Sequence, residues 1–425
     1  MNSKSTPPDD PLAPSSRCRR LNPGVDTKQG LYVAYWMVRS RRTFWNPALE
    51  RAAAWARLLG QSLLVCEPLD WSRQLDSRRS HRFFLDGMVS NARRLSYAGV
   101  LYHPHVAAVE TNRFAGDDMA GASDPMETTR PAASSNRATD SDGLLEAVAR
   151  RASVWVTDLY PAADTGDLSH LTRGRALAIP AEAVDGERLD PDLPTLLDST
   201  DPALNFDGTA EARLRERMVE LLRALPSRNP LAKFYETHLQ AVLPHITNRW
   251  PAADGMLLAG DLEALASLPV GAPEPFPSAR GGSDAGFEHW RRIIGALTGA
   301  DSDGTLKETA APSDAFGVDA EADETFFQSL PLPALLHTAP EAPSATELLG
   351  YYLSAGHLSG YQVLVEALRH SAWTPDRLRP GAGSPLEWWG LPTSVARLVE
   401  TFVVQRERAL DRDLRRAEAA LEASS

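Results

Sequence analysis

The sequence predicts an α/β N-terminal domain, with a Rossmann-like parallel sheet covered by helices on both faces, followed by an all-α C-terminal domain. Short apolar runs alternate with amphipathic segments between residues 31 and 184, and strand-like runs stop after about residue 205. The runs are apolar throughout rather than alternating apolar and polar. That pattern is typical of strands buried on both faces of a parallel sheet.

The first domain opens with the strand-like run "LYVAYWMV", which starts at Leu31. A helix follows in "NPALERAAAWARLLG", where Asn46 can cap the N-terminus, Pro47 suits the first turn and Gly60 can end the helix. Strands alternate with helices in the rest of the domain. In order, these are the strand "SLLVCEPL", the helix "DSRRSHRFFLDGMVSNARRLSYAG", the strand "GVLYHPHV", the helix "GLLEAVARRA" and the strands "SVWVTDLYP" and "ALAIPAEAV". We therefore expect five mainly parallel strands within Leu31–Val184.

The second half reads as helices from about Thr209 onwards. Helical periodicity runs through "TAEARLRERMVELLRAL", "PLAKFYETHLQAVLPHI" and "SDAGFEHWRRIIGAL", and the last of these has Ser283 as a possible cap. In "ATELLGYYLSAGHLSGYQVLVEAL", residues 345–368, one helix pauses at Ala-Gly-His and a second starts at Ser359. The final helix grades from apolar to heavily charged.

Changes in composition suggest the domain boundaries. We expect a disordered tail at 1–30, an α/β domain at 31–200 with a mobile insert at 107–142, a connector with helices at 201–283, and a helical domain at 284–425 with an acidic insert at 299–324.

Composition and missing motifs exclude several classes of protein. The 425-residue chain has a net charge of −12, which argues against a surface made for non-specific nucleic-acid binding, although a local basic groove is compatible with it. Its two cysteines, Cys18 and Cys66, lie far apart and form no CxxC, which excludes a disulfide framework and a zinc ribbon. Neither GxGxxG nor GxxxxGK[ST] occurs, which argues against a dinucleotide or P-loop site.

The histidines and the N-terminus add two further expectations. No HExxH occurs, and His103 and His105 in "YHPHV" are read as the end of a strand rather than as metal ligands, so no metal site is predicted. The sequence has no membrane span and no secretory signal, so the expected location is the cytoplasm.

Several words occur in an order and spacing that resembles the cryptochrome/photolyase family, most of all class II-type and bacterial deoxyribodipyrimidine photolyases. The resemblance covers most of the sequence from Leu31 to Leu410. The words are "YWMVRSRRTFWNPAL", "YHPHV", "VTDLYP", "RWPAA", "SLPV", "ARGGSDAGFEHWRRI", "YYLSAGHLS" and "WWGLPTSVARLVETFVVQRERAL". It implies FAD in the helical domain, light-dependent repair of pyrimidine dimers in DNA by a carbon–carbon lyase, and an antenna chromophore of unknown identity in the α/β domain.

The helix pair at residues 345–368 corresponds to the family word "TSxLSPYLHFGxIS", whose hydroxyls and amides hold the FAD phosphates. The resemblance implies five cofactor-binding residues: Thr346, Leu349, Gly350, Tyr352 and Gly356. Glu347 and Gly350 stand where the family has serine, which adds a repelling carboxylate and removes a donor. The competing interpretation is a helical corner whose apolar residues belong to the core.

The word "VVQRERAL" resembles the family's "WRELxFN", which contacts the dimer, and this implies that Arg406 and Glu407 are catalytic. Gln405 stands where the family has the stacking tryptophan. The alternative is a solvated charged face. A DNA groove would draw on four further arginines, whose alternative is ordinary solvated surface. They are Arg291, Arg292, Arg377 and Arg379.

Two larger departures predict weakened or lost flavin binding and catalysis. The acidic insert at 299–324 replaces a Tyr/Arg loop of the family, and the sequence ends at Ser425, before the helices that close the flavin pocket in the family. Three hypotheses follow: a light-driven DNA repair enzyme, a non-catalytic interaction or regulatory module derived from a photolyase, and one half of a split photolyase completed by a second polypeptide.

Overall fold

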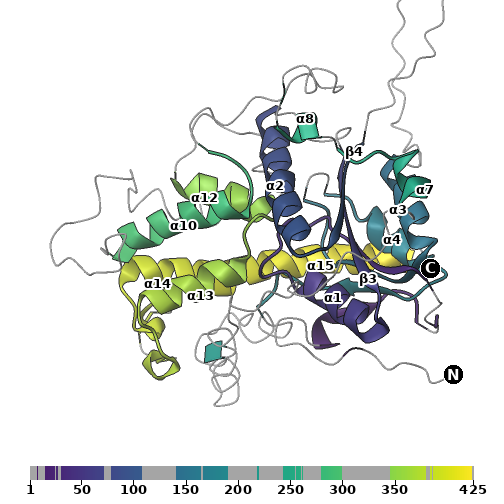
Figure 1. Ribbon diagram of the computed structural model, residues 1–425. Helices are drawn as coiled ribbons and strands as arrows, with labels where there is room; N and C mark the ends of the chain where they lie inside the picture. Colours follow the sequence, from purple (N-terminus) through teal and green to yellow (C-terminus); the bar gives the residue numbers. More distant parts are fainter. Residues whose placement is uncertain are drawn as a thin grey trace, which may run out of the picture.

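The computed structural model consists of a sheet flanked by helices and an adjoining group of helices (Figure 1). It describes residues 15–23, 25–26, 30–70, 78–107, 140–163, 166–189, 243–253, 255–259, 279–298, 345–379, 383–384 and 386–423, with single positions at 7, 261 and the pair 218–219. Most of the two predicted inserts lies outside these residues. Residue 107 ends a strand and residues 140–142 begin a helix, so the described structure reaches into the range assigned to the first insert.

The sheet has six strands in the order β1-β6-β5-β2-β3-β4. All five predicted strands are present and are parallel to one another, which confirms the α/β class. The strands are β2 (Tyr32–Trp36), β3 (Ser62–Asp70), β4 (Leu101–Ala107), β5 (Ala152–Asp158) and β6 (Ala181–Val184), with β1 (Cys18–Arg20) at the edge.

Strand β1 lies inside the segment that was expected to be a disordered tail. It runs antiparallel to β6, with Cys18 opposite Val184, and follows a short 3-10 turn, η1 (Ser15–Arg17). The Arg17 guanidinium fixes the entry to the strand by donating to the carbonyls of Arg188 and Leu189, each at 2.6 Å. A three-residue polar strand has no apolar periodicity, and its backbone pairing with an edge strand does not depend on side-chain pattern.

Helices cover both faces of the sheet, as predicted. Helices α1 (Pro47–Leu59) and α2 (Arg78–Tyr97) pack on the face that carries Val33 and Tyr35, whereas α3 (Asp140–Ala149) and α4 (Ser169–Arg175) pack on the face that carries Ala34 and Trp36. The predicted ends of α1 are confirmed. The Asn46 side chain accepts from the Leu49 N–H, and Gly60 adopts the left-handed conformation at the C-cap.

The second part of the described chain is helical. Its helices are α7 (Pro244–Thr247), α8 (Gly255–Ala259), α10 (Ser283–Thr298), α12 (Ala345–Ser354), α13 (Gly360–His370), α14 (Thr393–Glu400) and α15 (Arg406–Ala423), with 3-10 turns η4 (Pro375–Arg377) and η5 (Glu387–Trp389). A π-helical turn, η6 (Thr401–Gln405), joins α14 to α15 without a break. As expected, Ser359 caps α13, and its hydroxyl accepts from the Tyr361 N–H.

The α14–η6–α15 helix reaches from the helical part to the sheet (Figure 1). Val395, Val399 and Phe402 belong to the core of the helical part, whereas Leu410 and Leu421 belong to the core beneath α3 and α4. An apolar stripe with helical spacing thus continues through both halves of this helix. One helix therefore belongs to both hydrophobic cores.

A buried ion cluster joins the two parts where this helix crosses between them. The Glu187 carboxylate accepts from Arg42 in the loop after β2, at 3.2 Å, and from Arg406 at the start of α15. Arg406 also donates to the Glu187 carbonyl at 2.6 Å. Arg42 donates in addition to the Gly356 carbonyl, between α12 and α13, at 3.1 Å.

We expect Glu187→Gln to lower the free energy of unfolding by about 3–5 kcal/mol, because the change leaves two buried guanidinium groups with a neutral partner. Chemical denaturation of the full chain measures the loss. The matched control is Glu288→Gln, which removes an exposed pair with Arg292 and should cost less than about 1 kcal/mol. Equal losses in the two variants would contradict the structural role of the cluster.

Candidate functional site

The corner between α12 and α13 lies against the loop that follows β2. Gly356 has φ of +74°, and a Cβ atom there would stand 1.9 Å from the Arg39 carbonyl oxygen and 2.8 Å from the Arg41 nitrogen. Arg42 reaches from the loop to the carbonyls of Gly356 and Leu358. The corner is therefore held by the α/β domain, and only a residue without a side chain fits at its tip.

The loop after β2 is itself organised by Asp158, at the end of β5. One carboxylate oxygen of Asp158 accepts from three successive backbone N–H groups, those of Val38, Arg39 and Ser40, at 2.8–3.2 Å. Such a row of N–H groups commonly forms a phosphate-binding site in proteins. Here the chain's own Asp158 carboxylate accepts these hydrogen bonds.

Five consecutive polar residues of this loop, 39–43, are buried between the two parts of the molecule. Arg41 pairs with Glu67 at 3.2 Å and donates to the Pro68 carbonyl at 2.8 Å. Glu67 also accepts from Tyr102 at 2.6 Å, and burial followed by the Glu67 charge raises the pKa of that phenol. The network makes the loop a rigid partner for the α12–α13 corner.

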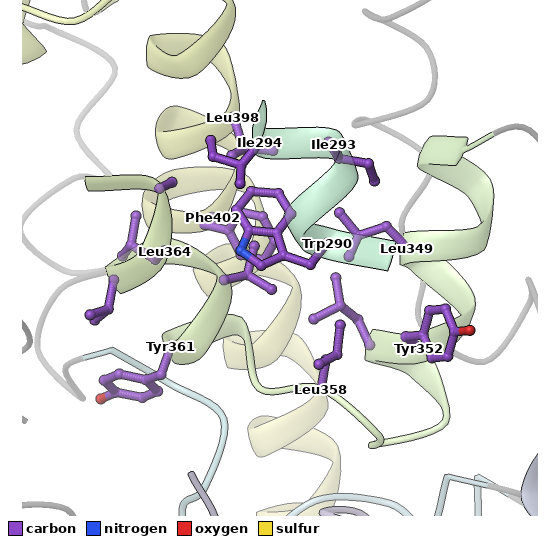
Figure 2. Packing of buried hydrophobic residues seen from close by; sticks show 14 of the residues in the cluster. Trp290, Ile293, Ile294, Leu349, Tyr352, Leu358, Tyr361, Leu364, Leu398 and Phe402 are labelled. Atoms are coloured by element: carbon purple, nitrogen blue, oxygen red, sulfur yellow. The ribbon is translucent and has the colours of Figure 1, made fainter. Parts of the chain in front are cut away.

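The region where the resemblance implies FAD is filled by side chains in the described structure. Trp290, on α10, is completely buried at the centre of the helical part. Figure 2 shows its ring surrounded by apolar residues of α12, α13, α14 and η6. They include Leu349, Leu364, Leu398 and Phe402. These described residues form a continuous hydrophobic core around the indole ring.

Four of the five predicted cofactor residues have described side-chain environments. Leu349 and Tyr352 are buried in the core, and the Tyr352 hydroxyl donates to the Arg280 carbonyl at 2.7 Å. Gly350 is buried on α12, and Gly356 faces the loop of the α/β domain. The Thr346 side chain lies outside the described residues. This arrangement is that of a helical corner, which is the competing interpretation of these residues.

His357, next to Gly356, was not singled out from the sequence. Its Nδ1 accepts from the Gly282 N–H at 2.9 Å, so the neutral ring carries its proton on Nε2, which has no hydrogen-bond partner. That nitrogen lies over Gly87, where a Cβ atom would be only 2.2 Å away. Burial, followed by the charges of Arg41 and Arg42, lowers the pKa of His357 to about 3.

The predicted catalytic residues are found at the domain joint. Arg406 is only 6% exposed and is bound to Glu187, so its guanidinium belongs neither to an open DNA-facing surface nor to a solvated charged face. The Glu407 side chain lies outside the described residues. Charge and helical pattern alone do not indicate that Arg406 is buried.

The four predicted DNA-binding arginines are exposed and come from two elements. On α10, Arg292 pairs with Glu288, and the Arg291 guanidinium lies 4.5 Å from the centre of the Phe287 ring. After α13, Arg377 lies in η4 and Arg379 donates to the carbonyls of Asp376 and Leu378. They remain candidates for a DNA contact.

A hollow at the carboxyl end of β2 and β3 was also missed. Such edges of parallel sheets commonly bind ligands. Its lining includes Trp36, Asp70, Asp142, Asp167 and His170. The cavity volume of about 40 Å³ holds only a few water molecules and is far below that of usual ligand pockets. Asp70, a polar residue that ends the apolar run of β3, was the available sequence signal.

The described ranges contain no group of three or more His, Cys, Asp or Glu side chains arranged to hold a metal ion. The rings of His103 and His105 are stacked 6.2 Å apart, and burial followed by the charge of His105 lowers the pKa of His103 to about 4. No helix among the described residues is long and apolar enough to cross a membrane.

Comparison with known proteins points to photolyases. No family model matches the chain. A deoxyribodipyrimidine photo-lyase of Methanothermobacter thermautotrophicus is 36% identical over 74 residues, which are 17% of each protein. A bacterial class III photolyase from Agrobacterium tumefaciens aligns structurally with a TM-score of 0.43 at 14% identity, over 92% of this chain and 59% of that one. Both alignments thus cover less than two thirds of the photolyase, and the sequence match supports the predicted relationship.

We expect Gly356→Ala to destabilise the protein more than Gly60→Ala. Both glycines have positive φ, which costs an alanine about 1–2 kcal/mol. No atom lies within 4 Å of a Cβ at Gly60, whereas the corner must also accommodate a clash, at about 1–3 kcal/mol more. Thermal and chemical denaturation of the two variants measure the difference. An equal effect would mean that the corner is not held against the loop.

Stability should fall as the pH is lowered from about 6.5 towards 3. An unfolded histidine binds its proton near pH 6.5, whereas folded His357 does so only at about 3. The unfolded state therefore gains protons first. His357→Gln should flatten part of this pH dependence in denaturation curves, and His370→Gln, at an exposed position, should leave it unchanged. A His357 variant with the full wild-type slope would contradict the assignment.

Proposed function

We propose that this chain, which is related in sequence to photolyases, is a non-catalytic photolyase-derived protein that acts as an interaction or regulatory module without flavin chemistry. The observation that supports this proposal best is the core around Trp290, in the region where the resemblance implies FAD.

A ligand of the size of FAD requires a pocket of several hundred Å³, whereas the described side chains around Trp290 pack into a hydrophobic core. Removing a buried tryptophan from its contacts costs about 3–5 kcal/mol. Flavin binding in this region would have to offset that cost before any gain in affinity. The residues present therefore do not fit the cofactor, and no catalytic step through it is proposed.

Arg406 is the residue for which the resemblance implies a contact with the DNA lesion. Its guanidinium is a partner of the buried Glu187 carboxylate. Turning Arg406 towards DNA would leave that carboxylate with one partner fewer, and breaking a buried pair costs about 3–5 kcal/mol. The residue is thus better suited to holding the two domains together than to contacting a substrate.

A second candidate function is light-dependent repair of pyrimidine dimers, which the sequence match to a deoxyribodipyrimidine photo-lyase favours. In that case Arg291, Arg292, Arg377 and Arg379 would be available for DNA phosphates because they are exposed. The split-photolyase hypothesis adds a second polypeptide that completes the flavin pocket.

The absorption spectrum of the purified full chain between the near-ultraviolet and blue, before and after denaturation, separates these functions. We expect no flavin bands, also after incubation with FAD, and no light-dependent loss of thymine dimers from an oligonucleotide. The photo-lyase of Methanothermobacter thermautotrophicus, purified and assayed in parallel, is the positive control.

Stoichiometric FAD together with dimer splitting under blue light would refute the proposal and establish the repair function. Flavin uptake only after addition of another polypeptide would favour the split-photolyase hypothesis. If dimer-containing DNA binds without repair, replacing the four arginines pairwise by glutamine tests whether α10 or the η4 turn makes the contact.

A further inference from the structure

Three guanidinium groups act on the single carboxylate of Glu187 at the domain joint. Burial alone would raise the pKa of Glu187, but the charges of Arg42, Arg406 and Arg39 together hold it below its ordinary value. Arg42 and Arg406 each hydrogen-bond one oxygen of the carboxylate. All three arginines and Glu187 are buried away from solvent.

Arg39 differs from the other two arginines because two nitrogens of its guanidinium have no hydrogen-bonded partner among the described residues. The residue is 2% exposed, and its Nε and Nη2 have no hydrogen-bond partner. Buried ionised groups without a partner are costly and rare in folded proteins. The structure therefore contains a buried cation that calls for an anion.

The neighbouring carboxylates are already engaged. Asp158 accepts from the loop amides and from the Tyr35 hydroxyl. Asp185, which precedes Glu187, accepts from the backbone N–H groups of Glu187 and Arg188. The two oxygens of Glu187 already accept from Arg42 and Arg406. None of these groups hydrogen-bonds the Arg39 guanidinium.

The two unpartnered nitrogens also define the shape of the missing ligand. Nε–H and one N–H of Nη2 lie on the same edge of the planar guanidinium and point in parallel. This is the edge that forms a two-pronged hydrogen bond with two oxygens of a carboxylate or phosphate. A tetrahedral oxyanion offers such a pair of oxygens from any side, whereas a single water molecule does not.

We propose that Arg39 binds a phosphate-type oxyanion at the joint between the two domains, and that the bound anion stabilises their contact. Arg42 and Arg406 bind both oxygens of the Glu187 carboxylate and so offset its repulsion of the anion. Deep burial of Arg39 favours a free inorganic ion over the phosphate group of a larger molecule. The inference does not depend on whether the protein binds flavin.

The test compares the melting temperature of the full chain with Arg39→Met in phosphate and in chloride, at pH 7 and constant ionic strength. For the wild type we expect a saturable rise, about 2 °C at ten times the dissociation constant. The variant should lack this rise. Without phosphate it should melt at the same temperature as the wild type or higher, because an unpaired buried charge has been replaced by an apolar chain of similar length. The order of the two proteins should therefore reverse as phosphate is added.

Two control variants separate anion binding from other effects. Phosphate also stabilises proteins by exclusion from their surface, and Arg93→Met, at an exposed position on α2, should retain the complete wild-type response. Arg42→Met should lower the melting temperature at every phosphate concentration, because it breaks the bond to Glu187. An equal phosphate response in wild type and Arg39→Met would overturn the proposal.

Equilibrium dialysis with labelled phosphate provides a direct readout. One bound ion per wild-type chain and none per Arg39→Met chain would support the proposal, and equal binding to both would overturn it. If the methionine variant does not fold, Arg39→Lys replaces it. A lysine lacks the two-pronged edge, so its phosphate affinity should fall at least tenfold, and unchanged affinity would overturn the proposal. Adenosine monophosphate serves as a second probe, and tighter binding than inorganic phosphate would identify a phosphate ester as the source of the anion.

Discussion

Glu187 lies where the sheet, the loop after β2 and the α14–η6–α15 helix meet. Its carboxylate determines how the two halves of the molecule are joined. Since both oxygens are buried and bound to guanidinium groups, neither Arg42 nor Arg406 can move without exposing an uncompensated charge. Two glycines allow this close approach. A Cβ at Gly356 would meet the Arg39 carbonyl, and one at Gly360 would lie 2.6–2.9 Å from the Arg406 guanidinium.

The same constraint explains why residues that match photolyase words have a structural role here. The Tyr352 ring packs 4.9 Å from that of Phe83 on α2, and Arg42 reaches the corner beside it. Thus the two segments that match photolyase words, residues 35–49 and residues 351–359, contact each other directly through Arg42. Side chains that hold two domains in register are under strong packing constraints whether or not a cofactor is bound. Their presence alone is therefore weak support for flavin chemistry.

Much of the fold followed from patterns that act locally. The apolar run of β2 and the caps Asn46 and Gly60 were predicted correctly, because burial on both faces and capping geometry leave direct traces in sequence. Strand β1 was missed because its pairing uses backbone groups alone. The environment of Arg406 was missed for another reason. Its partner Glu187 is 219 positions away in the sequence, and the charge of a side chain does not indicate whether it will be buried.

The candidate site was less predictable than the fold. The pause at Ala-Gly-His correctly indicated two helices meeting at Gly356, but periodicity cannot tell whether the space between helices holds a ligand or the ring of Trp290. Arg39 shows the same limit. In the sequence it is one of three arginines in a short loop-like stretch, and only the three-dimensional arrangement distinguishes it as the one whose side chain has no hydrogen bond among the described residues.

The helix shared by both cores has a consequence for biosynthesis. Leu410, Ala417 and Leu421 cover part of the sheet face on which α3 and α4 lie, and Glu418 pairs with Arg19 next to the first strand. A domain that emerges first from the ribosome commonly folds before the rest has been made. Here the α/β domain exposes an apolar strip until residues 410–421 have been translated, so its folding is completed only after the helical part has been made, and chaperone binding to the nascent chain is most advantageous during that interval.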